Sequence, residues 1–304
     1  MKYLILLLAI VTLLTVGFGL RRKKKNSQER EKLSWPKENS SVAEARKVLE
    51  NRDPWEIAAW LTAHFPSSKE IWPNLKTACH ELGLEGIYLG ALGERNAKRD
   101  LALEVLALIG SEKSLPLLFE LLTNREERIS FLACQTIVRL GLIEAVPYAV
   151  DALLFPSRIL PARSGEILTA FGSEAVPYIL KALPQADSRG KIQILELLGE
   201  LKDKNSLPGL ESCLTDPEGD VRAQAVTGLS HFPEAGPMLL RALKDSHWKV
   251  QAAAARGLGK LKYKEAVPYL QKLSSAEDWH LKTSAEEALE EIAAANQAYV
   301  KEDK

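Results

Sequence analysis

Histidine and cysteine are the side chains of this sequence best suited to coordinate a metal or to act as nucleophiles. Five histidines and three cysteines are spread along the chain: His64, His80, His231, His247, His280, Cys79, Cys134 and Cys213. Cys79 and His80 are adjacent, and adjacent side chains on a helix diverge by about 100°. A zinc site needs three or four converging ligands. The sequence therefore predicts no metal site and no cofactor.

Motifs that support other chemistry were sought in the same way. The run Gly257-Leu258-Gly259-Lys260 resembles part of a phosphate-binding loop, but that loop follows a strand and ends in Ser or Thr, whereas Leu261 follows here within a helical pattern. Glu286 and Glu290 form a carboxylate pair on an amphipathic helix, where such pairs are typical of a solvated face. No catalytic residue is predicted, and the chain is not expected to be an enzyme.

Two tryptophans are candidates for binding a partner. Trp248 and Trp279 are 31 residues apart and are flanked by His247 and His280. If the chain repeats with that period, the rings would stack into an aromatic ledge, and tryptophan is a frequent anchor at interfaces. The alternative is that both rings pack between neighbouring repeats.

Basic residues recur at the predicted start of the second helix of successive repeats: Arg128, Arg163, Lys191, Arg222, Lys249 and Lys282. Such a row would line the concave face of a helical array and attract an acidic ligand. The alternative is that these cations pair with acids of neighbouring repeats, such as Asp216 or Asp220. The predicted partner site comprises Trp248, Trp279, Arg222, Lys249 and Lys282.

Composition places the chain among ordinary globular proteins, with 46% hydrophobic and 26% charged residues in a length of 304. Three widely spaced cysteines exclude a disulfide scaffold and favour a reducing compartment. Six of the 40 basic residues lie in the first 25 positions, which hold no acid, so the remainder carries 34 basic against 40 acidic residues. That acidic body argues against nucleic-acid binding, which depends on neutralising phosphates.

The N-terminus carries an apolar run. Residues 3–20 hold no charge, and as a helix they would span about 27 Å, close to the hydrocarbon core of a bilayer. A basic cluster follows at the predicted membrane interface: Arg21, Arg22, Lys23, Lys24 and Lys25. A cleaved signal peptide and a buried helix are the alternatives. The positive-inside rule predicts a single-pass protein of the inner membrane, with its N-terminus outside and its repeat domain in the cytoplasm.

A period near 30 residues runs through the rest of the chain. An aliphatic or small residue followed by proline recurs at Leu115-Pro116, Val146-Pro147, Val176-Pro177, Leu207-Pro208, Gly236-Pro237 and Val267-Pro268. A small residue precedes each of these at Gly110, Gly141, Gly172, Gly199, Ser230 and Gly259. Two independent landmarks with one period predict structural repeats.

Each repeat is predicted to be a pair of short helices. Proline suits the first position of a helix because its missing N–H would be unpaired there. The second helix carries apolar residues at i, i+4 and i+8, as in Val221, Ala225 and Leu229, and the small landmark residue or its neighbour is expected to stop it. One pair cannot bury its own apolar face, so neighbouring pairs must stack.

The predicted fold is therefore all-α: an α-solenoid of roughly six to eight helix pairs, preceded by one transmembrane helix. Residues 3–20 form the predicted anchor, 21–41 a basic and polar linker, 42–110 divergent N-terminal repeats or a cap, and 111–299 the repeat array. The last helix, from about Leu281, is rich in glutamate, which gives the polar outer face that a terminal capping helix needs.

Two segments, DPEGDVRAQAVTGLS (216–230) and KDSHWKVQAAAARGLGKL (244–261), resemble the HEAT repeat. They are similar to the short bacterial type first associated with phycobilin lyases, which runs Asp-x-x-x-x-Val-Arg-x-x-Ala, then Ala-Leu-Gly, then Leu-Pro. Val221-Arg222 fits that pattern, whereas Val250-Gln251 departs from it. The resemblance covers about 96–295 and implies a solenoid, while HEAT arrays serve many unrelated tasks.

One hypothesis and two alternatives follow. The chain is predicted to be a membrane-anchored cytoplasmic HEAT-repeat scaffold that binds a protein partner on its concave face, with no nucleic acid and no small-molecule cofactor. A bilin lyase or isomerase-like role in handling a chromophore, implied only by the resemblance, is the first alternative. A HEAT-type nucleic-acid binder is the second, and the acidic body counts against it.

Overall fold

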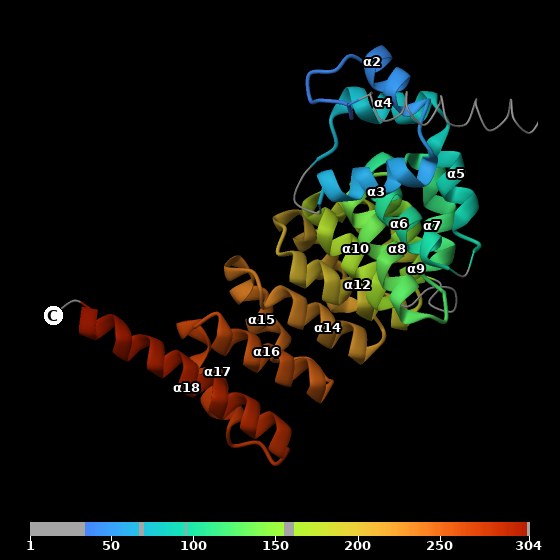
Figure 1. The fold of residues 1–304 in the computed structure, drawn as a ribbon. Helices are drawn as coiled ribbons and strands as arrows, with labels where there is room; N and C mark the ends of the chain where they lie inside the picture. Colours follow the sequence, from blue (N-terminus) through green and yellow to red (C-terminus); the bar gives the residue numbers. More distant parts are fainter. Residues whose placement is uncertain (1–33, 67–69, 95, 155–160, 303–304) are drawn as a thin grey trace, which may run out of the picture. The chain divides into compact units, whose positions relative to one another are not determined.

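The computed structural model describes residues 34–66, 70–94, 96–154 and 161–302 (Figure 1). The chain divides into two compact units, unit 1 up to Leu118 and unit 2 from Phe119 onward. Every regular element in the described ranges is a helix, and none is a β-strand. The all-α prediction is confirmed for this part of the chain.

Unit 1 is a small helical assembly. Its helices are α2 (Val42–Leu49), α3 (Pro54–His64), α4 (Pro73–Glu81), α5 (Leu84–Ala91) and α6 (Ala97–Ile109), and the division between the units falls within α7 (Leu115–Leu121). Helix α2 packs on α4, while α3 and α5 both pack on α6. Asp53 and Asn96 cap α3 and α6, because each side chain accepts a hydrogen bond from a backbone N–H two residues later.

Aromatic packing secures the beginning of unit 1. Trp35 stacks on Trp60 with ring centroids 4.7 Å apart, and the Arg52 guanidinium lies 3.8 Å from the centre of the Trp35 ring. The neighbouring Pro36 is buried. Trp35 and Pro36 belong to the segment predicted as a linker, 21–41, so the end of that segment is part of the packed unit.

A buried carboxylate joins two segments of unit 1. Glu85 on α5 accepts hydrogen bonds from the backbone N–H and the hydroxyl of Ser111, both at 2.8 Å, and from the hydroxyl of Ser114 at 2.6 Å. Desolvation raises the pKa of Glu85, but the bonds from Ser114 and Ser111 outweigh it and hold the pKa below its ordinary value. The carboxylate therefore remains charged while it is largely buried.

Unit 2 repeats one motif, a short first helix followed by a second helix. The first helices are α9 (Ala145–Leu154), α11 (Val176–Ala182), α13 (Leu207–Ser212), α15 (Gly236–Ala242) and α17 (Val267–Leu273). The second helices, which α8 (Glu127–Leu140) precedes, are α10 (Pro161–Phe171), α12 (Ser188–Leu201), α14 (Gly219–Leu229), α16 (Trp248–Lys260) and α18 (Trp279–Glu302). Each first helix packs on the second helix that follows it, and consecutive second helices pack side by side (Figure 1). The solenoid-like arrangement is confirmed.

The proline landmarks lie at helix starts as predicted, although Pro147 is the third residue of α9. Pro177, Pro208, Pro237 and Pro268 occupy one of the first two positions of α11, α13, α15 and α17. Among the small landmark residues, Gly141 ends α8 with φ +60°, in the left-handed region that favours glycine. Proline at a helix start and glycine at a positive φ are both favoured by the backbone conformation at that residue.

Two other landmark glycines lie in the last turn of a helix, Gly199 two residues before the end of α12 and Gly259 one residue before the end of α16. A Cβ at Gly199 in α12 would lie 2.8 Å from the Cα of Gly228 in α14, and a Cβ at Gly259 in α16 would lie 2.7 Å from the Cα of Ala288 in α18. The four C-terminal second helices therefore touch at three pairs of small residues: Gly199–Gly228, Ser230–Gly257 and Gly259–Ala288. Small side chains at these positions let the helix backbones approach closely.

The predicted single-pass localisation in the inner membrane is corrected. In the described ranges no helix combines the length and the apolar character needed to cross a bilayer. The longest of them, α18, exposes Lys282 and the four glutamates of its outer face, which a hydrocarbon core would not accommodate. The predicted anchor at 3–20 and the interface cluster at 21–25 lie outside the described residues.

Replacing Gly199 with alanine should destabilise unit 2. Helix propensity alone would favour alanine by up to about 1 kcal/mol. The added methyl group would instead press on the backbone of α14, and overpacking of this kind costs about 1–3 kcal/mol. We expect a lower urea midpoint of unfolding, measured by circular dichroism.

Gly165→Ala in α10 is the matched control, because a Cβ there would meet nothing within 4 Å. It should leave the urea midpoint unchanged or raise it. If Gly199→Ala raised the midpoint equally, close approach of α12 and α14 would not be a constraint on the fold.

Candidate functional site

The aromatic ledge consists of His247, Trp248, Trp279 and His280. The imidazole of His280 bridges the two indoles, with its centroid 4.8 Å from that of Trp248 and 4.1 Å from that of Trp279. His247 lies further away, 6.5 Å from Trp248 and nearly parallel to it. Trp248 is 39% exposed and Trp279 is 65% exposed, so the ledge presents large apolar rings to solvent.

The repeat register positions the ledge. Trp248 and Trp279 are the first residues of α16 and α18, and two residues after each comes a buried aliphatic side chain, Val250 or Leu281. At the same place in α14 stands Gly219, where a Cβ would overlap the ring of His247. The ledge therefore lies at the N-terminal edge of the second-helix layer.

Arg222 is committed to contacts within the array. Its Nε and one terminal nitrogen each donate to Asp245 at 2.9 Å, and its other terminal nitrogen donates to the carbonyl oxygens of Asp216 and Pro217. The hydrogen bonds from Arg222 hold the pKa of Asp245 below its ordinary value despite partial burial. This bidentate pair joins α14 to the loop that leads into α16.

Lys191 makes the equivalent contact one repeat earlier. Its amino group donates to Asp216 at 2.7 Å, just as Arg222 binds Asp245 in the following loop. Burial raises the pKa of Asp216, but the bond from Lys191 and other favourable contacts leave it lowered overall. Two of the predicted row of cations thus hold consecutive repeats together, as the pairing alternative anticipated.

The remaining cations of the predicted site have other acidic partners, although Lys282 follows the buried Leu281 just as Arg222 follows Val221. Lys249 precedes the buried Val250 and reaches back to Asp220 at 2.7 Å. Lys282 contacts Glu286 on its own helix at 3.9 Å. The cations that the sequence placed in one row therefore bind acids in different places. Lys191 and Arg222 bind the loop of the next repeat, Lys249 binds the previous repeat, and Lys282 contacts its own helix. All three site cations have an acidic partner.

Three exposed acids around the ledge have no ion-pair partner within the described part of the chain: Glu218, Glu277 and Asp278. Asp278 accepts hydrogen bonds from the backbone N–H groups of His280 and Leu281, at 2.9 and 3.2 Å, and so caps α18. These acids were not predicted from the sequence, because the charged positions that recur in successive repeats are basic. With the cations paired, the charge left around the ledge is negative.

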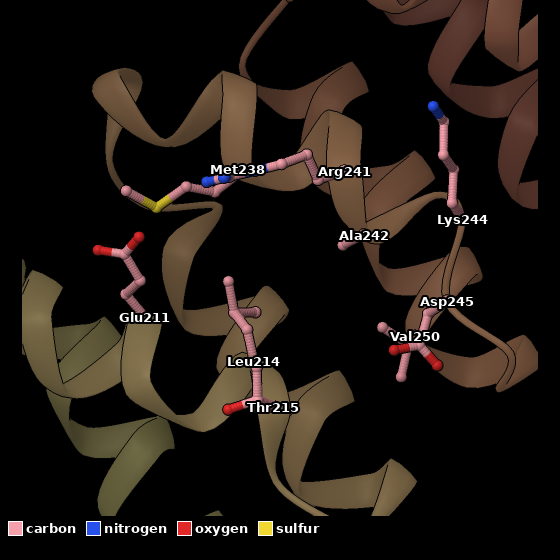
Figure 2. A pocket seen from close by; sticks show the side chains of 9 residues that line it. All are labelled: Glu211, Leu214, Thr215, Met238, Arg241, Ala242, Lys244, Asp245 and Val250. Atoms are coloured by element: carbon pink, nitrogen blue, oxygen red, sulfur yellow. The ribbon is translucent and has the colours of Figure 1, made fainter.

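A pocket of about 350 Å³ opens beside the Arg222–Asp245 pair, between α13, α15 and α16 (Figure 2). Its lining residues are Glu211, Leu214, Thr215, Met238, Arg241, Ala242, Lys244, Asp245 and Val250. Figure 2 shows Leu214 rising into its centre, Glu211 turned toward Met238, and Lys244 pointing away from Asp245. A pocket of about 390 Å³ lies one repeat earlier, beside Lys191 and Asp216, which identifies both as grooves between consecutive first helices.

The described cysteines offer no activated nucleophile. Cys79, Cys134 and Cys213 are buried and free, and burial raises the pKa of the Cys79 and Cys134 thiols to about 12. They are protonated at neutral pH, and the thiol is a poor nucleophile compared with the thiolate. Within the described ranges no three His, Cys, Asp or Glu side chains come together as metal ligands.

Parts of the chain are similar in sequence to known proteins. Residues 236–299 match the family of HEAT repeats. Over 138 residues the chain is 30% identical to bilin biosynthesis protein RpcF of Synechococcus sp. (strain WH8020), a match that covers 41% of this chain and 66% of the relative, just under two thirds of its length. Residues 236–299 are therefore similar to HEAT repeats, and the chain is similar to RpcF over the matched 138 residues.

Two solved structures are also similar. A crystal structure of an engineered protein is 16% identical, with 84% of this chain and 82% of that chain covered and a TM-score of 0.37. Human deoxyhypusine hydroxylase in complex with glycerol is 16% identical, with 91% and 98% covered and a TM-score of 0.26. These scores are too low to support an inference about activity.

Replacing Asp245 with asparagine should destabilise unit 2 by about 1–3 kcal/mol at pH 7, because Arg222 loses a charged, bidentate acceptor while it remains largely buried. The pKa of Asp245 is lower in the folded than in the unfolded state. Its stabilisation is therefore present above the unfolded pKa of about 3.9 and is lost as the pH falls through the folded value. Urea unfolding over that pH range measures both effects.

The matched control is Glu234→Gln, which removes the exposed Lys204–Glu234 pair at 3.5 Å and should leave the free energy of unfolding unchanged. A difference between Asp245→Asn and the wild type that persisted unchanged at low pH would contradict a role for the Asp245 charge.

Proposed function

We propose that this HEAT-repeat chain is a scaffold that binds a protein partner, with Trp248 and Trp279 as the anchoring side chains. The observation that carries the proposal is the exposure of the two indoles in a fixed arrangement, 39% and 65%, with His280 in contact with both. Large aromatic rings at low entropic cost are frequent anchors at interfaces, and clustered exposed apolar rings often mark an interaction surface.

In this proposal the basic residues do not steer an acidic ligand, although the sequence predicted that they would. Arg222 and Lys249 are already paired with Asp245 and Asp220, so steering an acidic ligand would require breaking those pairs. In this proposal Arg222 instead positions the ledge, because Asp245 also accepts a hydrogen bond from the backbone N–H of His247 at 2.8 Å. The charged network fixes the loop from which Trp248 projects.

The double variant Trp248→Ala, Trp279→Ala should lose partner binding. Peptides selected from a random display library for binding to the wild-type chain should bind this variant at least about 30-fold more weakly, since anchoring residues contribute about 2 kcal/mol or more. Fluorescence anisotropy of labelled peptides measures the affinities.

Tyr269→Ala on α17 is the matched control, because it removes another large exposed ring, 46% exposed, away from the ledge. It should leave peptide binding unchanged. Trp279→Ala should alter the free energy of unfolding by less than about 1 kcal/mol. A loss of about 3–5 kcal/mol would instead identify the rings as core packing, and equal binding to the double variant would remove the ledge as the site.

A role in bilin biosynthesis is the second candidate, favoured by the 30% identity to RpcF over 138 residues. In this role the chain would hold or hand over an open-chain tetrapyrrole, and a lyase or isomerase type of activity would accompany it. Covalent attachment to the chain's own cysteines is not part of this candidate, because the thiols are buried and protonated.

If the bilin candidate is correct, the purified chain should bind a free bilin such as phycocyanobilin. A bound bilin is held in one conformation, so we expect a saturable change in visible absorption and an induced circular dichroism signal. The chain unfolded in urea is the control and should give neither. A bilin spectrum that is the same with and without the folded chain would count against this candidate.

A further inference from the structure

The exposed ring of Trp279 and the neighbouring carboxylates of Glu277 and Asp278 indicate which kind of partner the aromatic ledge binds. We infer that the ledge binds an arginine side chain in a basic segment of the partner, with the guanidinium stacked on the ring of Trp279 and held by neighbouring carboxylates. The inference rests on the proposed scaffold function and adds the chemistry of its partner.

The ring of Trp279 is available for such a contact. His280 lies against it with centroids 4.1 Å apart, which holds the indole in place, while 65% of the residue remains exposed. Leu281, in the first turn of α18, is buried and so fixes the position of that turn. Trp279 therefore offers a flat apolar surface whose position is already set before a partner arrives.

Two carboxylates immediately precede this ring in the chain. Glu277 and Asp278 immediately precede Trp279, are exposed, and have no ion-pair partner within the described ranges. Lys282, three residues after Trp279, contacts Glu286 at 3.9 Å, so these two charges offset each other. The local charge attracts a cation and repels an acidic ligand.

The N-terminus of α18 would by itself favour an anion, because its free N–H groups carry partial positive charge. Asp278 satisfies that requirement within the chain, since its carboxylate accepts from the N–H groups of His280 and Leu281. The nearby cation Lys249 is likewise occupied by Asp220. No unpaired positive group of the ledge is left for an acidic partner.

Arginine fits this arrangement better than lysine or a neutral ring. A guanidinium is planar, so it can lie flat on an indole and still direct its N–H groups sideways at carboxylates. The ammonium of lysine is a strongly hydrated point charge that has no flat face to stack. A neutral aromatic side chain would cover Trp279 but would gain nothing from Glu277 and Asp278.

The test uses the full chain, labelled with ¹⁵N, and three synthetic peptides: acetyl-Gly-Arg-Gly-Arg-Gly-amide and its counterparts with lysine or glutamate in place of arginine. Amide resonances of the first turn of α18 and the indole N–H of Trp279, assigned with Trp279→Phe, report binding. We expect saturable shifts with the arginine peptide, at least about threefold weaker binding of the lysine peptide, and no shift with the glutamate peptide.

Two variants separate the ring from the charges. Trp279→Ala should abolish the amide shifts caused by the arginine peptide. Glu277→Gln combined with Asp278→Asn should weaken binding at least threefold and flatten its dependence on salt, while asparagine preserves the helix cap. Tyr269→Ala, whose ring lies 5.9 Å from the Lys244 amino group, is the control and should leave binding unchanged.

Equal binding of the lysine peptide, tighter binding of the glutamate peptide, or shifts that survive in Trp279→Ala would overturn the arginine assignment. If display-selected peptides still lose affinity in the Trp248→Ala, Trp279→Ala variant, the scaffold proposal stands and only the partner chemistry is wrong. If neither those peptides nor the arginine peptide depends on the tryptophans, both proposals fail.

Discussion

Close contact between consecutive second helices is the constraint on which the C-terminal half of unit 2 depends. Gly199 meets Gly228, and Gly259 meets Ala288, at distances that leave no room for a larger side chain. Dispersion forces fall steeply with separation, so helices that touch at the backbone gain contacts that bulky residues would forbid. The same spacing brings each loop within reach of side chains from the neighbouring repeat.

The ion pairs and the aromatic ledge follow from that spacing. Arg222 can hold Asp245 with two hydrogen bonds of 2.9 Å only because α14 and the loop before α16 lie next to each other. One repeat further, the same proximity places His280 against Trp248. The pairs remove the positive charge of the second-helix starts, and the unpaired acids that remain give the ledge its negative surroundings.

The fold alone does not define the function of this chain, because HEAT arrays perform many unrelated tasks. The similarity to RpcF covers 41% of the chain and supports a role with bilins about as well as the helical repeats support a scaffold. The local features that bear on function are the two exposed indoles bridged by an imidazole and the carboxylates beside them. The proposals above therefore rest on the ledge and not on the repeat architecture.

The sequence by itself determined the helix pairs, the period near 30 residues and the equivalence of Trp248 with Trp279, because proline chemistry and apolar spacing act along the chain. It did not reveal that Gly199 and Gly259 touch the next second helix, and it placed Lys249 in one row with Arg222. A landmark glycine can end a helix or admit a neighbouring backbone, and a cation at a helix start can face the previous or the next repeat. Only the tertiary structure decided between these, because the deciding atoms, such as the Cα of Gly228 and the carboxylates of Asp220 and Asp245, belong to other repeats.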